Sequence, residues 1–366
     1  MSLRPAKEVA WLPLPPRRSR VRSRLIMGLA GGLAVLVILV SGYTIWWLDA
    51  ADRFRTQTLT WVEQRRAEGW QIAFTDVRRR GFPDALGVRF ERPELSPPGR
   101  PDLHWRASRL RLSAPVFSAR PPRFAVSGDQ SIEFLEAGEI RHLSGRAEQM
   151  SFDLQRADGW MPNGRLAVRD LSLTDDHGET IALGRLDIIS TGDPAAAATA
   201  DVSTWGVRLA AERMQLPKGL LTACSGPIDR LDADAELYGP LAPSPWPLAL
   251  ARWRDEGGVI ELGRLQVACG ELKLDGEGTL ALDKEGQPMG AMSTHVQGYD
   301  AALDRLAAAQ AIDPHVAAAA KILLRALARS DADGAATLNA PVTLQDRSLS
   351  IGPVKLLRIP PVRWLE

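Results

Sequence analysis

Most of this chain alternates between apolar and polar residues in short runs that end at Gly, Asp or Pro. In the clearest run, every even position from Leu272 to Leu282 is Leu or Gly, and turn residues follow at 283–286. Because successive side chains of a strand point to opposite faces, this alternation predicts strands with one buried and one solvated face. With 31 Gly and 26 Pro to supply turns, the fold is predicted to be mainly β with some α (α+β), in antiparallel pairs.

One run changes phase part-way along. The apolar residues stand first at the even positions Leu166 and Val168, and then at the odd positions Leu171 and Leu173. We interpret the two groups as the buried faces of two successive strands. A turn is predicted directly after them at residues 175–178, and the alternation resumes beyond it. The pattern shows that one face of these strands is buried, but not what lies against it.

A segment without charge, Leu25–Leu48, predicts a transmembrane helix. At about 1.5 Å per residue it is roughly 36 Å long, which exceeds a hydrocarbon core of about 30 Å. Tyr43, Trp46 and Trp47 lie near its end, where aromatic rings favour the headgroup layer. A cleaved signal peptide is the alternative, but its apolar region is about 7–15 residues long, so we predict an uncleaved anchor.

Two further helical segments are expected. Residues 52–69 carry apolar residues among polar ones and predict an amphipathic helix that ends at Gly69. Residues 299–329 are rich in Ala and Leu at helical spacing. Pro314 interrupts this second segment, which predicts two helices that meet near Asp313.

The length of the body suggests more than one folding unit, because it exceeds the usual size of a single domain. We expect a first β-rich lobe at residues 49–191 and a second at 201–366, which contains the helical segment. The small-residue stretch 192–200 between them has no apolar periodicity.

The net charge of +1 excludes a strongly basic nucleic-acid binder, but it averages two different parts. Seven of the 45 basic and two of the 44 acidic residues fall in residues 1–50, which leaves 38 basic and 42 acidic residues in the body. The basic leader, residues 1–24, is expected to be disordered. By the positive-inside rule it lies in the cytoplasm, with the body across the membrane.

A few short motifs resemble a known family. Gly69-Trp70 is followed by Gly81-Phe82-Pro83 within DVRRRGFPDALGVRFERPEL, and the chain ends in LSIGPVKLLRIPPVRW after the Ala/Leu helices. This order is similar to the bacterial family known as domain of unknown function 2125, and more distantly to AsmA-like envelope proteins. The resemblance implies a single-pass inner-membrane protein with a periplasmic body, and a curved antiparallel sheet that handles lipid. The residues alone leave a closed sandwich equally open.

Gly81, Phe82 and Pro83 are the most distinctive local motif, and we expect a structural turn there. The neighbouring Arg78, Arg79 and Arg80 are either a solvated charge run or contacts for lipid headgroups.

The two cysteines, Cys224 and Cys269, fall in the part expected to be periplasmic, so a disulfide is expected, with an inert buried thiol as the alternative. The five histidines show no metal-ligand spacing, and no nucleophile elbow, P-loop or dinucleotide fingerprint occurs. We therefore expect no catalytic, cofactor or metal site, and no enzyme activity.

Two functions remain. The first is an anchored, non-catalytic periplasmic protein that binds or handles lipid in envelope maintenance, with phospholipid acyl chains as its ligand. The second is an anchored scaffold that binds another envelope protein.

Overall fold

The chain divides into two units, Met1–Asp52 and Arg53–Glu366. The computed structural model describes residues 20–100, 102–118, 120–136, 139–156, 163–192, 203–217, 223–240, 246–330 and 336–362. Most of the basic leader lies outside these residues, but its last part is helical, because the first helix begins at Arg20.

The first helix, α1 (Arg20–Ala67), contains the uncharged segment. Within the described chain it holds the one stretch, Gly31–Ala67, that is long and apolar enough to span a membrane. Side chains such as Leu33 and Ile38 are more than 60% exposed in the protein alone, which favours a lipid environment over water. The helix ends as expected: Gly69 has a φ of 94°, and the Trp70 N–H donates to the Arg65 carbonyl.

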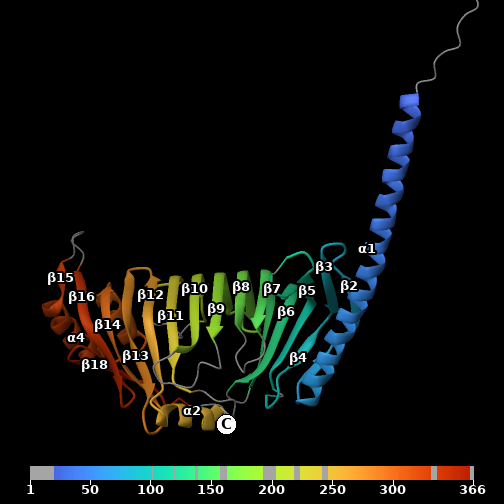
Figure 1. Cartoon of the computed structure of the whole chain (residues 1–366). Coiled ribbons are helices and arrows are strands. Elements are labelled where there is room, and N and C mark those ends of the chain that lie inside the picture. Colours follow the sequence, from blue (N-terminus) through green and yellow to red (C-terminus); the bar gives the residue numbers. More distant parts are fainter. Residues whose placement is uncertain are drawn as a thin grey trace, which may run out of the picture. The chain divides into compact units, whose positions relative to one another are not determined.

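The second unit is built on one large antiparallel sheet in which strands follow one another in chain order (Figure 1). Two of its strands are interrupted. β3 and β4 act as one broken strand beside β5, and β2 and β1 act as a second broken strand beside β3 and β4. The strands are β1 (Gln71–Ala73), β2 (Asp76–Arg80), β3 (Ala85–Glu91), β4 (Glu94–Ser96), β5 (His104–Pro115), β6 (Arg123–Glu136), β7 (Glu139–Arg156), β8 (Asn163–Asp175), β9 (Thr180–Gly192), β10 (Ser203–Gln215), β11 (Ile228–Tyr238), β12 (Val259–Cys269), β13 (Leu272–Leu282), β14 (Pro288–Gln297), β15 (Arg329–Ser330), β16 (Ala336–Gln345), β17 (Ser348–Ile351) and β18 (Val354–Arg358).

This sheet continues through the join that we expected between two lobes. Residues of β9 and β10 pair from Trp205 opposite Gly192 to Gln215 opposite Ala182. The hydrogen-bond ladder therefore crosses the predicted boundary, although residues 193–202 lie outside the described chain. The sheet is not closed into a barrel.

Three helices accompany the sheet. The helices α3 (Tyr299–Ala308) and α4 (Pro314–Leu327) confirm the predicted break, and the side chain of Asp313 accepts a hydrogen bond from the His315 N–H to cap α4. They cover the end of the sheet around β13, β16 and β18, where Leu324 and Leu338 are fully buried. The sequence did not predict α2 (Trp246–Asp255), which lies at one end of the strands (Figure 1).

The change of phase between Val168 and Leu171 does not separate two strands, as the sequence predicts, and has a different cause. Leu166 and Leu173 belong to one strand, β8, which continues through the step. At the step, Asp170 has a φ of 44° and lies opposite Gly184, because Arg169 and Leu171 pair on either side of it. The residue is displaced from the ladder, and the alternation resumes in the opposite phase.

The same displacement occurs at one position on each neighbouring strand, and these positions face one another across the sheet. Four of them, on every second strand, have a positive φ: Arg92 (48°), Gly128 (87°), Asp170 (44°) and Arg213 (51°). The full row is Thr75, Arg92, Ser108, Gly128, Glu148, Asp170, Gly184, Arg213 and Asp229, where the gaps at Thr75 and Arg92 also include Phe74 and Pro93. We call this set the displaced row.

We predict that the displaced row tolerates Gly but not a β-branched residue. Asp170→Gly should leave the free energy of unfolding within about 0.5 kcal/mol, because relief of the positive φ offsets the added chain entropy. Asp170→Val should lower it by about 1–3 kcal/mol. Denaturant unfolding of the purified full chain measures both.

Ser172→Val is the matched control, since it changes an exposed position on the same strand with ordinary backbone geometry. It should be nearly neutral. Equal losses for Val at positions 170 and 172 would contradict this account of the row.

Candidate functional site

One face of the sheet is apolar from β2 to β16. Thirteen residues, each paired with the next across neighbouring strands, form a transverse row on this face. They are Val77, Phe90, Leu110, Val126, Met150, Val168, Leu186, Ala211, Leu231, Val267, Leu274, Val296 and Leu338. At about 4.8 Å between strands, this row extends roughly 58 Å along the sheet.

The displaced row makes this face wider along each strand. On four neighbouring strands, two apolar residues that are three positions apart pack into one cluster. Simple alternation would place them on opposite faces. These pairs are Ala147 with Met150, Val168 with Leu171, Leu183 with Leu186, and Ala211 with Met214.

Within the part of the chain that the structure describes, α3 and α4 cover this apolar face at its C-terminal end. There α4 packs on β16 and β18, and α3 packs on β13. No described helix packs extensively on β6–β10, whose apolar side chains are instead half-buried among one another. Val168 is 2% exposed because larger residues, including Leu166 and Leu186, lie around it.

The opposite face carries alternating charges, which we call the charged face. Asp187 on β9 is its best-buried carboxylate, at 6% exposure. Three guanidinium groups from two strands reach it: Arg165 at 2.6 Å, Arg185 at 2.7 Å and Arg169 at 3.2 Å. Burial alone raises the pKa of Asp187. The hydrogen bonds from Arg165 and Arg185 and the nearby positive charges outweigh that effect and lower this pKa to about 2.

The same face has further cross-strand ion pairs. Arg208 of β10 lies 2.8 Å from Asp234 of β11, and Arg123 of β6 donates to Asp153 of β7 over 2.8 Å. Long arginine side chains thereby cover the charged face of the sheet with their own partners, so this face is suited to water rather than to lipid.

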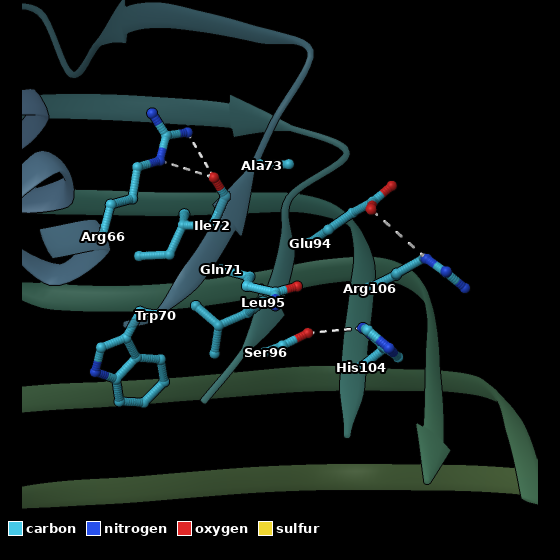
Figure 2. A pocket seen from close by; sticks show the side chains of 10 residues that line it. All are labelled: Arg66, Trp70, Gln71, Ile72, Ala73, Glu94, Leu95, Ser96, His104 and Arg106. Carbon is cyan, nitrogen blue, oxygen red and sulfur yellow. Dashed lines mark hydrogen bonds and ion pairs between the residues drawn. The ribbon is translucent and has the colours of Figure 1, made fainter. Parts of the chain in front are cut away.

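A hollow of about 430 Å³ lies between the end of α1 and β1, β4 and β5 (Figure 2). Its walls combine apolar and polar residues, and the charged groups among them have partners: the Arg66 Nε donates to the Ile72 carbonyl over 2.9 Å, and Arg106 lies 3.8 Å from Glu94. The residues that line it are Arg66, Trp70, Gln71, Ile72, Ala73, Glu94, Leu95, Ser96, His104 and Arg106.

Ser96 and His104 are the residue types of a nucleophile and its base, and their Oγ and Nδ1 atoms lie 2.7 Å apart in this hollow (Figure 2). Ser96 is only 3% exposed, however, so its hydroxyl does not face the space that a substrate would occupy. The contact joins β4 to β5, and we assign it a structural role.

The residues Gly81, Phe82 and Pro83 form the turn between β2 and β3. The Phe82–Pro83 peptide is cis, and Gly81 has a φ of 108°. A Cβ on Gly81 would lie 2.4 Å from the Ala85 carbonyl oxygen, so no other residue fits without a shift of the backbone.

The structure separates the three arginines that precede this turn. Arg78 is paired with Asp76 at 2.6 Å. Arg79 lies opposite Val88, on the apolar face, whereas Arg78 and Arg80 lie on the charged face. The three arginines therefore do not share one face of the strand, and their contact with lipid headgroups stays a prediction.

Cys224 and Cys269 form a disulfide whose Cα atoms are 5.5 Å apart, and Cys269 is fully buried. The predicted interface aromatics lie on α1, where the rings of Tyr43 and Trp46 are 5.6 Å apart. A headgroup contact of these aromatics stays a prediction. No group of three His, Cys, Asp or Glu residues in the described chain is arranged to hold a metal ion.

Comparison with known proteins identifies one match. A family model described as "Uncharacterized protein conserved in bacteria (DUF2125)" matches residues 47–360. No curated protein and no solved structure matches the chain. The more distant resemblance to AsmA-like proteins stays a prediction.

We predict that Asp187 stabilises the sheet in a pH-dependent way. Asp187→Asn should lower the free energy of unfolding by about 1–2 kcal/mol at pH 7, because hydrogen bonds to a charged group are lost. Since the folded pKa is lowered, this contribution is present above pH 4 and disappears as the pH falls to about 2. Denaturant unfolding at pH 7 and at pH 2 measures the difference.

Asp234→Asn is the control, because Asp234 and its partner Arg208 are 41% and 68% exposed. It should change the stability by less than about 0.5 kcal/mol at either pH. A loss for Asp187→Asn that is the same at pH 2 as at pH 7 would contradict the assignment.

Proposed function

Because its match to that model covers most of its length, the chain belongs to the DUF2125 family, and we propose that it is a non-catalytic, membrane-anchored protein that holds lipid acyl chains on the apolar face of its sheet. The observation that carries this proposal is the row of thirteen apolar residues, which no described helix covers extensively between β6 and β10. A soluble protein rarely leaves so large an apolar surface without a partner.

The chemistry of this face suits hydrocarbon. Each buried methylene of an acyl chain contributes about 0.8 kcal/mol, so a chain laid along several strands would bind without any polar contact. The charged face differs, since its arginines and carboxylates are paired with one another. A sheet that curves toward its apolar face, as in AsmA-like proteins, is part of this proposal.

The proposed location is the bacterial inner membrane, with residues 1–24 in the cytoplasm and the body in the periplasm. The apolar segment of α1 supports an anchor, and the basic leader supports this orientation. The disulfide between Cys224 and Cys269 agrees with an oxidising compartment.

We predict that both cysteines are oxidised in growing cells. A maleimide reagent that adds mass to free thiols should modify the full chain only after reduction, because Cys224 and Cys269 are its only two cysteines. A variant that lacks residues 1–48 should stay in the cytoplasm and react without reduction. Free thiols in the full chain would argue against a periplasmic body.

We predict that charges on the apolar face release lipid. The full chain is purified in detergent, and the phospholipid bound per chain is measured by extraction and mass spectrometry. Leu171→Asp combined with Leu186→Asp should reduce this amount at least twofold, because each carboxylate would have to be desolvated beside the acyl chain.

Ser172→Asp on β8 is the control, since it adds a carboxylate to the same strand on the charged face. It should retain the wild-type amount of lipid, and any lipid around the anchor is common to all variants. Equal lipid content in all three folded proteins would refute lipid binding on this face.

A further inference from the structure

Four arginines gather on the charged face near the N-terminal edge of the sheet. They come from three neighbouring strands: Arg80 from β2, Arg89 from β3, and Arg109 and Arg111 from β5. Arg89 and Arg111 lie directly opposite each other in the antiparallel register. Like charges in directly opposite positions destabilise a pair of strands, so this arrangement needs a compensating negative charge.

The protein supplies few carboxylates at this place. Asp76 is engaged by Arg78 at 2.6 Å, and Glu91 lies 3.8 Å from the Nη1 atom of Arg89. Among the residues that the structure describes, Arg80, Arg109 and Arg111 have no ion pair or side-chain hydrogen bond.

Several other arginines on the charged face are matched. Arg123 pairs with Asp153, Arg165 with Asp187 and Arg208 with Asp234, each across neighbouring strands. The four arginines therefore differ from these pairs, because within the ion pairs that the described residues make, three of them have no carboxylate partner.

Arg89 is the least solvated of the four, with 21% of its side chain exposed. Burial and the charges of Arg80 and Arg111 lower the pKa of Arg89, although it remains a cation at neutral pH. An anion bound among these groups would remove this repulsion.

We propose that Arg80, Arg89, Arg109 and Arg111, the arginine cluster, form a binding site for a phosphate-bearing anion. Guanidinium groups donate paired hydrogen bonds that match the oxygens of a phosphate, and several donors with no acceptor of their own favour a multiply charged ligand. The site lies on the face opposite the apolar row, so it does not depend on the proposed lipid-binding function.

The test is thermal unfolding of the full chain in detergent, at constant pH and ionic strength, with chloride replaced by inorganic phosphate. Phosphate should raise the Tm of the wild-type protein by about 2–4 °C at concentrations several-fold above its Kd. Arg109→Gln combined with Arg111→Gln should abolish this rise. Arg208→Gln, a paired arginine on the same face, should keep it.

In chloride alone, Arg111→Gln should leave the Tm unchanged or higher, because it removes a repulsive charge from an exposed position. This single variant also serves as the test if the double variant does not fold. The proposal is overturned if phosphate does not raise the wild-type Tm, or if the variants of the arginine cluster keep the full rise.

Two short-chain lipids identify the source of the phosphate. Dihexanoyl phosphatidylglycerol is anionic and dihexanoyl phosphatidylcholine is zwitterionic, but their acyl chains are the same. A rise that is larger with the anionic lipid than with inorganic phosphate, and that Arg111→Gln removes, identifies a lipid headgroup. An equal rise identifies free phosphate, and a rise common to both lipids belongs to the apolar face.

Discussion

The register of the antiparallel ladder controls every other property of this sheet. Successive side chains of a strand point to opposite faces. The apolar side chains of a long strand therefore share one face only as long as apolar and polar residues alternate without interruption. The displaced row interrupts that alternation once per strand, at facing positions such as Asp170 and Gly184. Because neighbouring strands change phase at facing positions, pairing resumes on both sides of the row, and the two faces keep their separate characters.

Two consequences follow from this coordination. The apolar residues on both sides of the row form one surface instead of two, which is why Val168 and Leu171 pack in the same cluster. Most arginines and aspartates lie on the other face, where partners such as Arg165 and Asp187 meet across strands. An open sheet with one apolar and one charged face is thereby stabilised by its own ladder, and its apolar face is the surface on which we propose that lipid binds.

Local signals in the sequence predicted local structure well. Pro314 after Asp313 predicted the break between α3 and α4, and Gly69 predicted the end of α1, because both residues act on their own backbone. The helix α2 was missed, since ten residues with apolar Ala249 and Trp253 four positions apart give too weak a periodicity.

The pairing of strands that are distant in the sequence could not be predicted from such local signals. The step between Val168 and Leu171 was visible in the sequence, but a step of three fits a turn as well as a displaced residue, and only pairing with β7 and β9 decides between them. The continuity of the sheet at residues 192–203 is likewise a property of pairing, as is the burial of Asp187, two of whose arginine partners come from β8. The family match supports the motif-based prediction without extending it to a function.

The most direct measurement is site-specific photo-crosslinking in intact cells, with a photoreactive amino acid in place of Leu171 or of its neighbour Ser172. These two positions are adjacent on β8 and point to opposite faces of the sheet. Mass spectrometry should detect phospholipid adducts for the probe at position 171 and none for the probe at 172. Adducts with another protein at position 171, or no adduct at either position, would contradict the claim that the apolar face holds lipid.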